Sequence, residues 1–79
     1  PAATEFVRNE EQVRALGLTA RELEILAWMA EGLSNREIAE RAFVSENTVK
    51  THASRVLDKL GAARRTQAIQ RARELRLVP

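Results

Sequence analysis

The sequence predicts an all-α domain of four helices. No segment alternates apolar and polar residues as a half-buried strand does. Two segments open with a hydroxyl residue followed three positions later by Glu, which is the capping-box spacing of a helix N-terminus, and glycines stand where helical patterns stop. A chain of 79 residues has room for one such domain with a modest core.

The first predicted helix begins after Thr19, which has the capping-box spacing to Glu22, and stops near Gly32. A second, short helix begins after Ser34, which has the same spacing to Glu37. The inward faces of these two helices carry Leu23, Leu26, Ala27, Ala30, Ile38, Ala39 and Ala42.

The third predicted helix follows a tight apolar turn at residues 43–44. Ser45 is its natural N-cap, the helix extends to Leu60, and Gly61 ends it. A short helix, a tight turn and a longer helix form the helix-turn-helix arrangement, in which the second helix enters the major groove of DNA. The range Ser45 to Leu60 is therefore the predicted recognition helix.

A fourth amphipathic helix begins at about Arg65, and we expect Leu77 and Val78 to pack against the core behind it. Its apolar stripe contains Ala68, Ile69, Ala72 and Leu75. Residues 1–17 are interpreted as a linker or N-terminal extension, in which a helical turn capped by Asn9 can form, and residues 18–79 as the domain. Because the chain starts without an initiator Met, we expect it to be part of a longer protein.

Composition argues against several classes of protein. The chain has no Cys and a single His, so we expect no disulfide, no metal site and no cofactor. His52 has no hydroxyl or carboxylate at a spacing that would build a catalytic triad, so an enzyme is not expected. No apolar run approaches the ~20 residues needed to cross a bilayer, so we expect a cytoplasmic protein with no membrane partner.

Charge is distributed unevenly along the chain. Residues 1–44 carry five basic and eight acidic side chains, a net charge of −3, whereas residues 45–79 carry eight basic and three acidic side chains, a net charge of +5. A basic half joined to an acidic half favours a polyanion meeting one surface. The alternative interpretation is that these charges only solvate helix faces.

The predicted recognition helix has an unusual polar face. Its inward side carries Val49, Ala53, Val56 and Leu60, and its outward side carries Asn47, Thr51, Ser54 and Asp58. Asn, Thr and Ser each cost up to ~0.7 kcal/mol in a helix relative to Ala. Short side chains allow a helix to lie deep in the major groove, where they reach base edges, and Lys50 and Arg55 flank this face.

Contacts with DNA phosphates need donors at the edges of that face. Ser34, Asn35 and Arg36 stand at a helix N-terminus, where free backbone N–H groups favour an anion. Thr48, Arg55 and Lys59 can contact the DNA backbone beside the recognition helix. For Ser34 and Ser45, helix capping alone is the simpler alternative.

The segment from Leu18 to about Val78 closely resembles the LuxR-type (NarL/FixJ) helix-turn-helix domain of bacterial transcription regulators. The motifs that carry the resemblance occur in the family's order: LTARELEIL, GLSNREIA, VSENTVKTH and the KLG after the recognition helix. The ending RTQAIQRARELRLV resembles most the MalT-like subgroup. Arg76 stands where the family frequently has Gly, and His52 matches a family His that is mainly a packed residue.

The resemblance implies a DNA-binding output domain of a regulator, located in the bacterial cytoplasm at the nucleoid. It implies that the third helix reads the major groove and that the fourth helix forms a homodimer on an inverted-repeat operator, with RNA polymerase as a further partner. By position, base-edge contacts fall on Lys50, Thr51 and Ser54, and backbone contacts on Asn47, Thr48, Arg55 and Lys59. The N-terminal residues Ser34, Asn35 and Arg36 are added to the predicted backbone contacts because they stand at a helix N-terminus. The predicted dimer contacts are Ala68, Ile69 and Ala72.

Two rival functions remain open at this point. Region 4 of a bacterial sigma factor shares the LTxRE opening and would bind a promoter element within RNA polymerase, although His52 and the RTQAI segment favour the LuxR type. A helical protein-interaction module, with the fourth helix as its main surface, would show no salt-dependent DNA binding.

Overall fold

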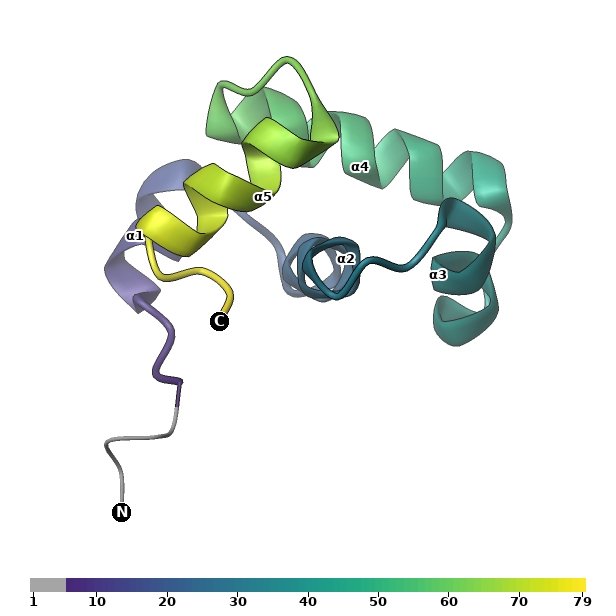
Figure 1. Cartoon of the computed structure of the whole chain (residues 1–79), viewed down its shortest axis with the longest axis horizontal. Helices are drawn as coiled ribbons and strands as arrows, with labels where there is room; N and C mark the ends of the chain where they lie inside the picture. The colour runs from purple at the N-terminus through teal and green to yellow at the C-terminus, as the bar shows by residue number, and fades with distance from the viewer. Residues whose placement is uncertain (1–5) are drawn as a thin grey trace.

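The computed structural model describes residues 6–79, which form five α-helices and no strand (Figure 1). The helices are α1 (Glu10–Leu16), α2 (Ala20–Ala30), α3 (Asn35–Ala42), α4 (Glu46–Leu60) and α5 (Arg65–Glu74). The all-α class is confirmed, and the four helices predicted for the domain correspond to α2, α3, α4 and α5. None of the helices in this range has the length and apolarity to span a membrane. Residues 1–5 of the predicted linker lie outside the described residues, and the division at residue 18 stays a prediction.

Helix α1 lies in the segment interpreted as a linker or extension, at the place where the sequence indicated a helical turn capped by Asn9. Its seven residues are too few to be helical alone, so contacts with the rest of the domain must stabilise it. Asn9 caps its N-terminus, and Gly17 ends it in the left-handed conformation with φ of 70°. Val13 is buried in the same cluster as Leu77, and the backbone N–H of Asn9 donates to the carbonyl of Arg76 (3.0 Å). The start of the described chain is thus held against its end.

The predicted helix N-termini are confirmed in detail. The hydroxyl of Thr19 accepts from the backbone N–H of Glu22 (3.1 Å), and the Glu22 carboxylate accepts from the backbone N–H of Thr19 (2.9 Å). Ser34 and Glu37 form the same reciprocal pair at 3.2 and 2.9 Å. Ser45 accepts from the backbone N–H three residues on (3.1 Å). Each cap satisfies donors that the first turn of a helix leaves free.

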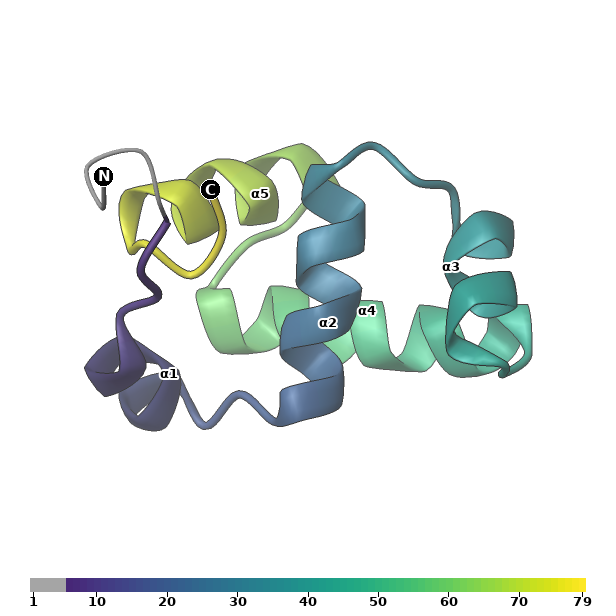
Figure 2. The same cartoon turned by 90° about the horizontal axis from the view of Figure 1, so that it is seen from below.

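Helix α2 lies at the centre of the core, and α4 passes across it (Figure 2). One cluster joins Leu26 of α2 to Val56 and Leu60 of α4, and the other joins Met29 of α2 to Val49 of α4. Helices α3 and α5 pack on opposite sides of α2, and both contact α4. The further buried side chains include Leu77 and Val78, as predicted. This packing fixes one side of α4 and leaves the opposite side in solvent.

The turn between α3 and α4 differs from the predicted apolar turn. Val44 is half-buried against the core, but Phe43 is 94% exposed and adopts the left-handed conformation with φ of 57°. This conformation ends α3 and lets the chain reverse within two residues of the next N-cap. Phe43 therefore shapes the turn through its backbone, whereas its ring does not contribute to the core.

Arg76 also adopts the left-handed conformation, with φ of 59°. An L-residue loses about 1 kcal/mol or more in this region, and a Gly does not. The variant Arg76→Gly is therefore expected to raise the free energy of unfolding by about 0.5 kcal/mol after the greater freedom of Gly in the unfolded chain is subtracted. Urea denaturation measures the change. The control Arg8→Gly, at an exposed position without positive φ, should lower stability; equal losses in both variants would contradict the explanation.

Candidate nucleic-acid interface

The outward side of α4 is an exposed polar surface on a rigid helix. The exposed side chains on it are Asn47, Lys50, Thr51, Ser54, Arg55 and Asp58. Val49 and Val56 on the opposite side are fully buried, and the left-handed Gly61 closes the helix (φ 65°). Because the buried side is fixed in the core, the outward side presents its residues in a defined orientation. Lys50, Ser54 and Arg55 make no side-chain hydrogen bond or ion pair within residues 6–79, so they are available to a ligand.

Two threonines on α4 use their hydroxyl groups in different ways. The hydroxyl of Thr51 donates to the backbone carbonyl of Asn47 (3.1 Å), which fixes the side chain while its oxygen can still accept a hydrogen bond. The hydroxyl of Thr48 lies 3.0 Å from that of Ser45, and its backbone N–H donates to the same Ser45 oxygen. Thr48 is therefore part of the helix cap, and Thr51 faces outward beside Ser54 on the next turn.

The N-terminus of α3 supplies a second set of donors. The Ser34 backbone N–H donates to the Glu37 carboxylate, and this hydrogen bond is the main cause that lowers the pKa of Glu37 below its ordinary value. The backbone N–H groups of Asn35 and Arg36 belong to the first turn, which has no acceptor within the helix. Ser34 thus caps the helix, which is the simpler of the two interpretations given from the sequence. Its hydroxyl hydrogen is still available to donate.

Arg65 is a residue of this edge that sequence reasoning missed. It is the first residue of α5, and its guanidinium donates a hydrogen bond to the side-chain oxygen of Asn35, the first residue of α3. One signal was present in the sequence. A cation at a helix N-terminus is opposed by the helix dipole, and α5 has no acidic residue in its first turn, so Arg65 does not serve the helix that carries it.

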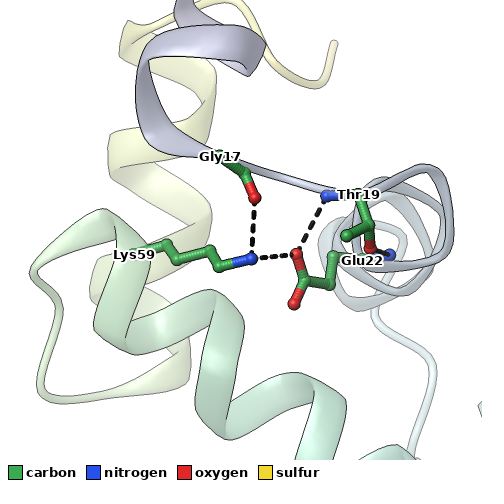
Figure 3. A network of polar contacts seen from close by, with 4 residues as sticks. All are labelled: Gly17, Thr19, Glu22 and Lys59. Atoms are coloured by element: carbon green, nitrogen blue, oxygen red, sulfur yellow. Dashed lines mark hydrogen bonds and ion pairs between the residues drawn. The ribbon is translucent and has the colours of Figure 1, made fainter.

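Lys59 lies in a network within the protein (Figure 3). Its ammonium is 2.6 Å from the Glu22 carboxylate and 2.7 Å from the backbone carbonyl of Gly17. The same Glu22 oxygen accepts from the backbone N–H of Thr19. These contacts connect the end of α1, the start of α2 and the last turn of α4. Two of the three N–H donors of the predicted phosphate contact are thus occupied inside the chain.

The charge of Glu22 is stabilised by this network. Its side chain is only 4% exposed and that of Lys59 is 30% exposed. Burial acts to raise the pKa of Glu22, but hydrogen bonds from Lys59 and Thr19 and the attraction of the ammonium outweigh it, so that the pKa lies below its ordinary value. Glu22 is therefore a buried carboxylate that stays ionised because it is paired and hydrogen-bonded.

The apolar stripe of α5 was predicted to contact a second copy, but most of it packs inside this chain. Ala68 and Ala72 are 0% exposed and belong to the core of this chain. Ile69 is half-buried and borders a groove of about 580 Å³ between α2 and α5, which is lined by Met29, Ala30, Gly32, Thr66, Ile69, Gln70, Arg73 and Glu74. Ala68 and Ala72 are thus corrected from dimer contacts to core residues, and Ile69 is the one member of the predicted set with an accessible surface.

His52 is half-buried, as expected for a packed residue, and its buried Nδ1 has no hydrogen-bond partner in the described structure. Within residues 6–79, no three His, Cys, Asp or Glu side chains lie where they would hold a metal ion.

The polar groups at the exposed side of α4 and at the N-terminus of α3 are suited to hydrogen bonding and charge neutralisation.

Comparisons with known proteins agree on one family. Residues 16–72 match the family described as GerE, bacterial regulatory proteins of the luxR family. The chain is 51% identical over 70 residues to the transcriptional regulatory protein YxjL of Bacillus subtilis, covering 84% of this chain and 32% of the relative. It is 49% identical over 67 residues to the DNA-binding transcriptional activator DevR/DosR of Mycobacterium tuberculosis, covering 85% of this chain and 31% of that protein. The chain thus spans about a third of the length of these relatives.

Two solved structures are similar to this fold. The response regulator ChrA of a heme-sensing two-component system is 53% identical with a TM-score of 0.74, over 76% of this chain and 30% of that one. The transcription factor GerE is 35% identical with a TM-score of 0.74, over 78% of this chain and 92% of GerE. The second comparison covers nearly a whole protein, so the helices described above have the arrangement of a known transcription factor.

Proposed function

The chain belongs to the luxR family of bacterial regulatory proteins, and from this premise we propose that it is the DNA-binding output domain of a longer transcription regulator. The LuxR-type resemblance predicted from the sequence is confirmed, and this favours a regulator over a sigma factor. The likeness of the C-terminal segment to the MalT-like subgroup stays a prediction. In the proposed function, α4 enters the major groove of double-stranded DNA.

One observation carries this proposal. The exposed side of α4 carries the short polar residues Asn47, Thr51 and Ser54, which are poor helix formers, and these side chains make few contacts with the rest of the protein. A helix packed as firmly as α4 gains no stability from this composition. Binding to base edges and phosphates is a physical reason for it, because donors and acceptors on a fixed helix can be matched to the groove.

The proposed contacts fall into two classes. Lys50, Thr51 and Ser54 contact base edges and distinguish one DNA sequence from another. The backbone contacts are Ser34, Asn35, Arg36, Asn47, Thr48 and Arg55, which hold the domain on the duplex. Lys59 is a weaker member of this class, because a phosphate has to compete with Glu22 for its ammonium or use its third N–H.

We propose that two copies bind an inverted repeat and contact each other through α5. The support is the accessible side of α5 around Ile69 and the groove beside it, in place of the buried alanines. RNA polymerase is a further proposed partner, and the proposed location is the bacterial cytoplasm at the nucleoid. We propose no catalytic activity, because the chemistry of the family is DNA binding.

Selection from a random pool of duplexes tests the function. The protein is incubated with the pool, the retained duplexes are sequenced, and the titration of an enriched duplex is repeated at several salt concentrations. We expect an inverted repeat whose binding falls steeply with salt. A single asymmetric element would indicate a sigma-like reader, and no retention at any salt concentration would refute DNA binding and direct attention to α5 as a protein-interaction surface.

A further inference from the structure

The contact between Arg65 and Asn35 joins two helix N-termini that are 30 residues apart in the sequence. Both side chains are half-buried, so each is restricted in the conformations it can adopt. The guanidinium of Arg65 can only donate, and therefore the Asn35 atom that faces it must be the amide oxygen. This fixes the orientation of the Asn35 amide and leaves its NH₂ group on the other side.

The charge of Arg65 is not neutralised by this contact. Asn35 is a neutral partner, and the ion pair found within residues 6–79 is the one between Lys59 and Glu22. The carboxylate of Glu37, one turn into α3, already accepts from Ser34 in the capping box. Arg65 thus holds a full positive charge in a fixed place without a carboxylate.

Every hydrogen-bonding group that this pair leaves unused is a donor. Arg65 has five N–H donors and uses one on Asn35, while the NH₂ of Asn35 has two. A ligand that satisfies them must offer several acceptors and negative charge, as a phosphate does. Asn35 stands next to Ser34, on the edge proposed above to contact the DNA backbone. In the proposed complex, a phosphate of the DNA backbone is therefore the ligand within reach of the pair.

We propose that Arg65 and Asn35 form a phosphate clamp, in which Asn35 positions the guanidinium and both side chains donate to one phosphate group of the DNA backbone. This inference rests on the proposed function and adds to it a residue from α5. The helix proposed to meet a second copy then begins at a residue bound to DNA. Because the pair is already in contact in the free protein, the clamp is preorganised and binding restricts its side chains little further.

The decisive variant is Asn35→Asp. It replaces the neutral partner of Arg65 with a carboxylate, so the contact between the two helices becomes an ion pair, while a phosphate at this place meets a negative charge. We expect binding to an inverted-repeat duplex and to a random duplex to weaken by the same factor, about tenfold or more. We also expect the thermal midpoint of unfolding to stay the same or rise, and an unchanged DNA affinity would show that no phosphate binds at this contact.

The companion variant is Arg65→Gln, which removes the charge. Affinity for both duplexes should fall equally, and the slope of log affinity against log salt should become shallower by about one. Arg14→Gln is the matched control, because it removes the same charge from the exposed side of α1, at the end of the molecule away from α3 (Figures 1 and 2). Its salt slope should equal that of the wild type.

The outcomes separate this inference from the function it rests on. If the wild type binds DNA and Asn35→Asp binds with unchanged affinity, the clamp alone is overturned. The same holds if the wild type binds DNA and the salt slope of Arg65→Gln is unchanged. A wild-type protein that retains no duplex at any salt concentration would overturn the clamp and the proposed function together. If Arg65→Gln does not fold, Asn35→Asp decides the question, because it keeps the two helices connected.

Discussion

Replacing Lys59 with Met is expected to lower the free energy of unfolding by about 2 to 3 kcal/mol, less than the ~3 to 5 kcal/mol for a fully buried pair that loses one partner. Met keeps the apolar stem of the side chain and removes the ammonium that contacts Glu22 and Gly17. The Glu22 carboxylate, 4% exposed, then has no cation beside it. The loss is smaller than for a fully buried pair because Lys59 is 30% exposed and water can partly replace it.

Urea denaturation of the wild type and four variants tests this expectation. Glu22→Gln should lose less than Lys59→Met, because the Lys59 ammonium can turn toward water. The double variant Glu22→Met with Lys59→Met should recover part of the loss, since it leaves no unpaired charge. Glu24→Gln removes a charge from an exposed position on the same helix and should leave stability within about 0.5 kcal/mol. A loss in Glu24→Gln equal to that in Lys59→Met would contradict a role for this pair.

The pH dependence of stability gives an independent check on Glu22. Its pKa is lowered in the folded protein, so the unfolded chain binds the proton at a higher pH than the folded chain does. Stability from Glu22 is therefore complete above the unfolded pKa of ~4.3 and is lost as the pH falls through the lower folded pKa. We expect Glu22→Gln to reduce the acid-induced loss of stability, with a remaining part from Glu37, whose pKa is also lowered.

The variant Lys59→Met also tests whether Lys59 contributes to DNA binding. If its main role is to hold the last turn of α4 against α1 and α2, Lys59→Met should change stability and leave the salt slope of DNA binding near that of the wild type. A slope shallower by about one at unchanged stability would support the phosphate contact that the sequence predicted. Measuring both quantities on one variant separates the two roles.

Features determined within four residues of the chain could be predicted from the sequence. The capping boxes of α2 and α3 and the Ser45 cap of α4 involve only neighbouring groups, and each forms as predicted. For α1, the sequence indicated a helical turn capped by Asn9, but the packing of this helix into the domain could not be predicted. Its stability depends on Val13 reaching a core that is completed by Leu77 at the other end of the chain, and nothing local marks that contact.

The candidate site shows the same limit. An apolar stripe in a helix indicates that a face is buried but does not say against which chain, so the pattern predicts Ala68 and Ala72 as dimer contacts although they pack in the core. A surface Lys indicates a charge but not its partner, and Glu22 lies 37 residues from Lys59. Arg65 was missed for the same reason, because its contact to Asn35 spans 30 residues.

The variants Lys50→Ala and Thr51→Ala are each expected to lose about 1 to 3 kcal/mol of discrimination between an enriched operator and the same duplex with one base pair changed. Neither side chain supports the core, since both are exposed. Thr51→Ser separates the two parts of Thr51, because it keeps the hydroxyl that donates to Asn47 and removes the methyl group that can contact a thymine. Titrations with operator, mismatched and random duplexes measure the loss. Arg55→Gln, in contrast, should weaken all three duplexes alike.

For Thr51→Ala, we expect stability and discrimination between DNA sequences to change in opposite directions. Thr51→Ala places a better helix former at an exposed position of α4, so the free energy of unfolding should stay the same or rise by up to about 0.6 kcal/mol. A variant that folds better and reads DNA worse would show that the short polar residues are retained for binding. A more stable Thr51→Ala that still distinguishes operator from mismatched DNA as the wild type does would remove the main support for α4 as the reading helix.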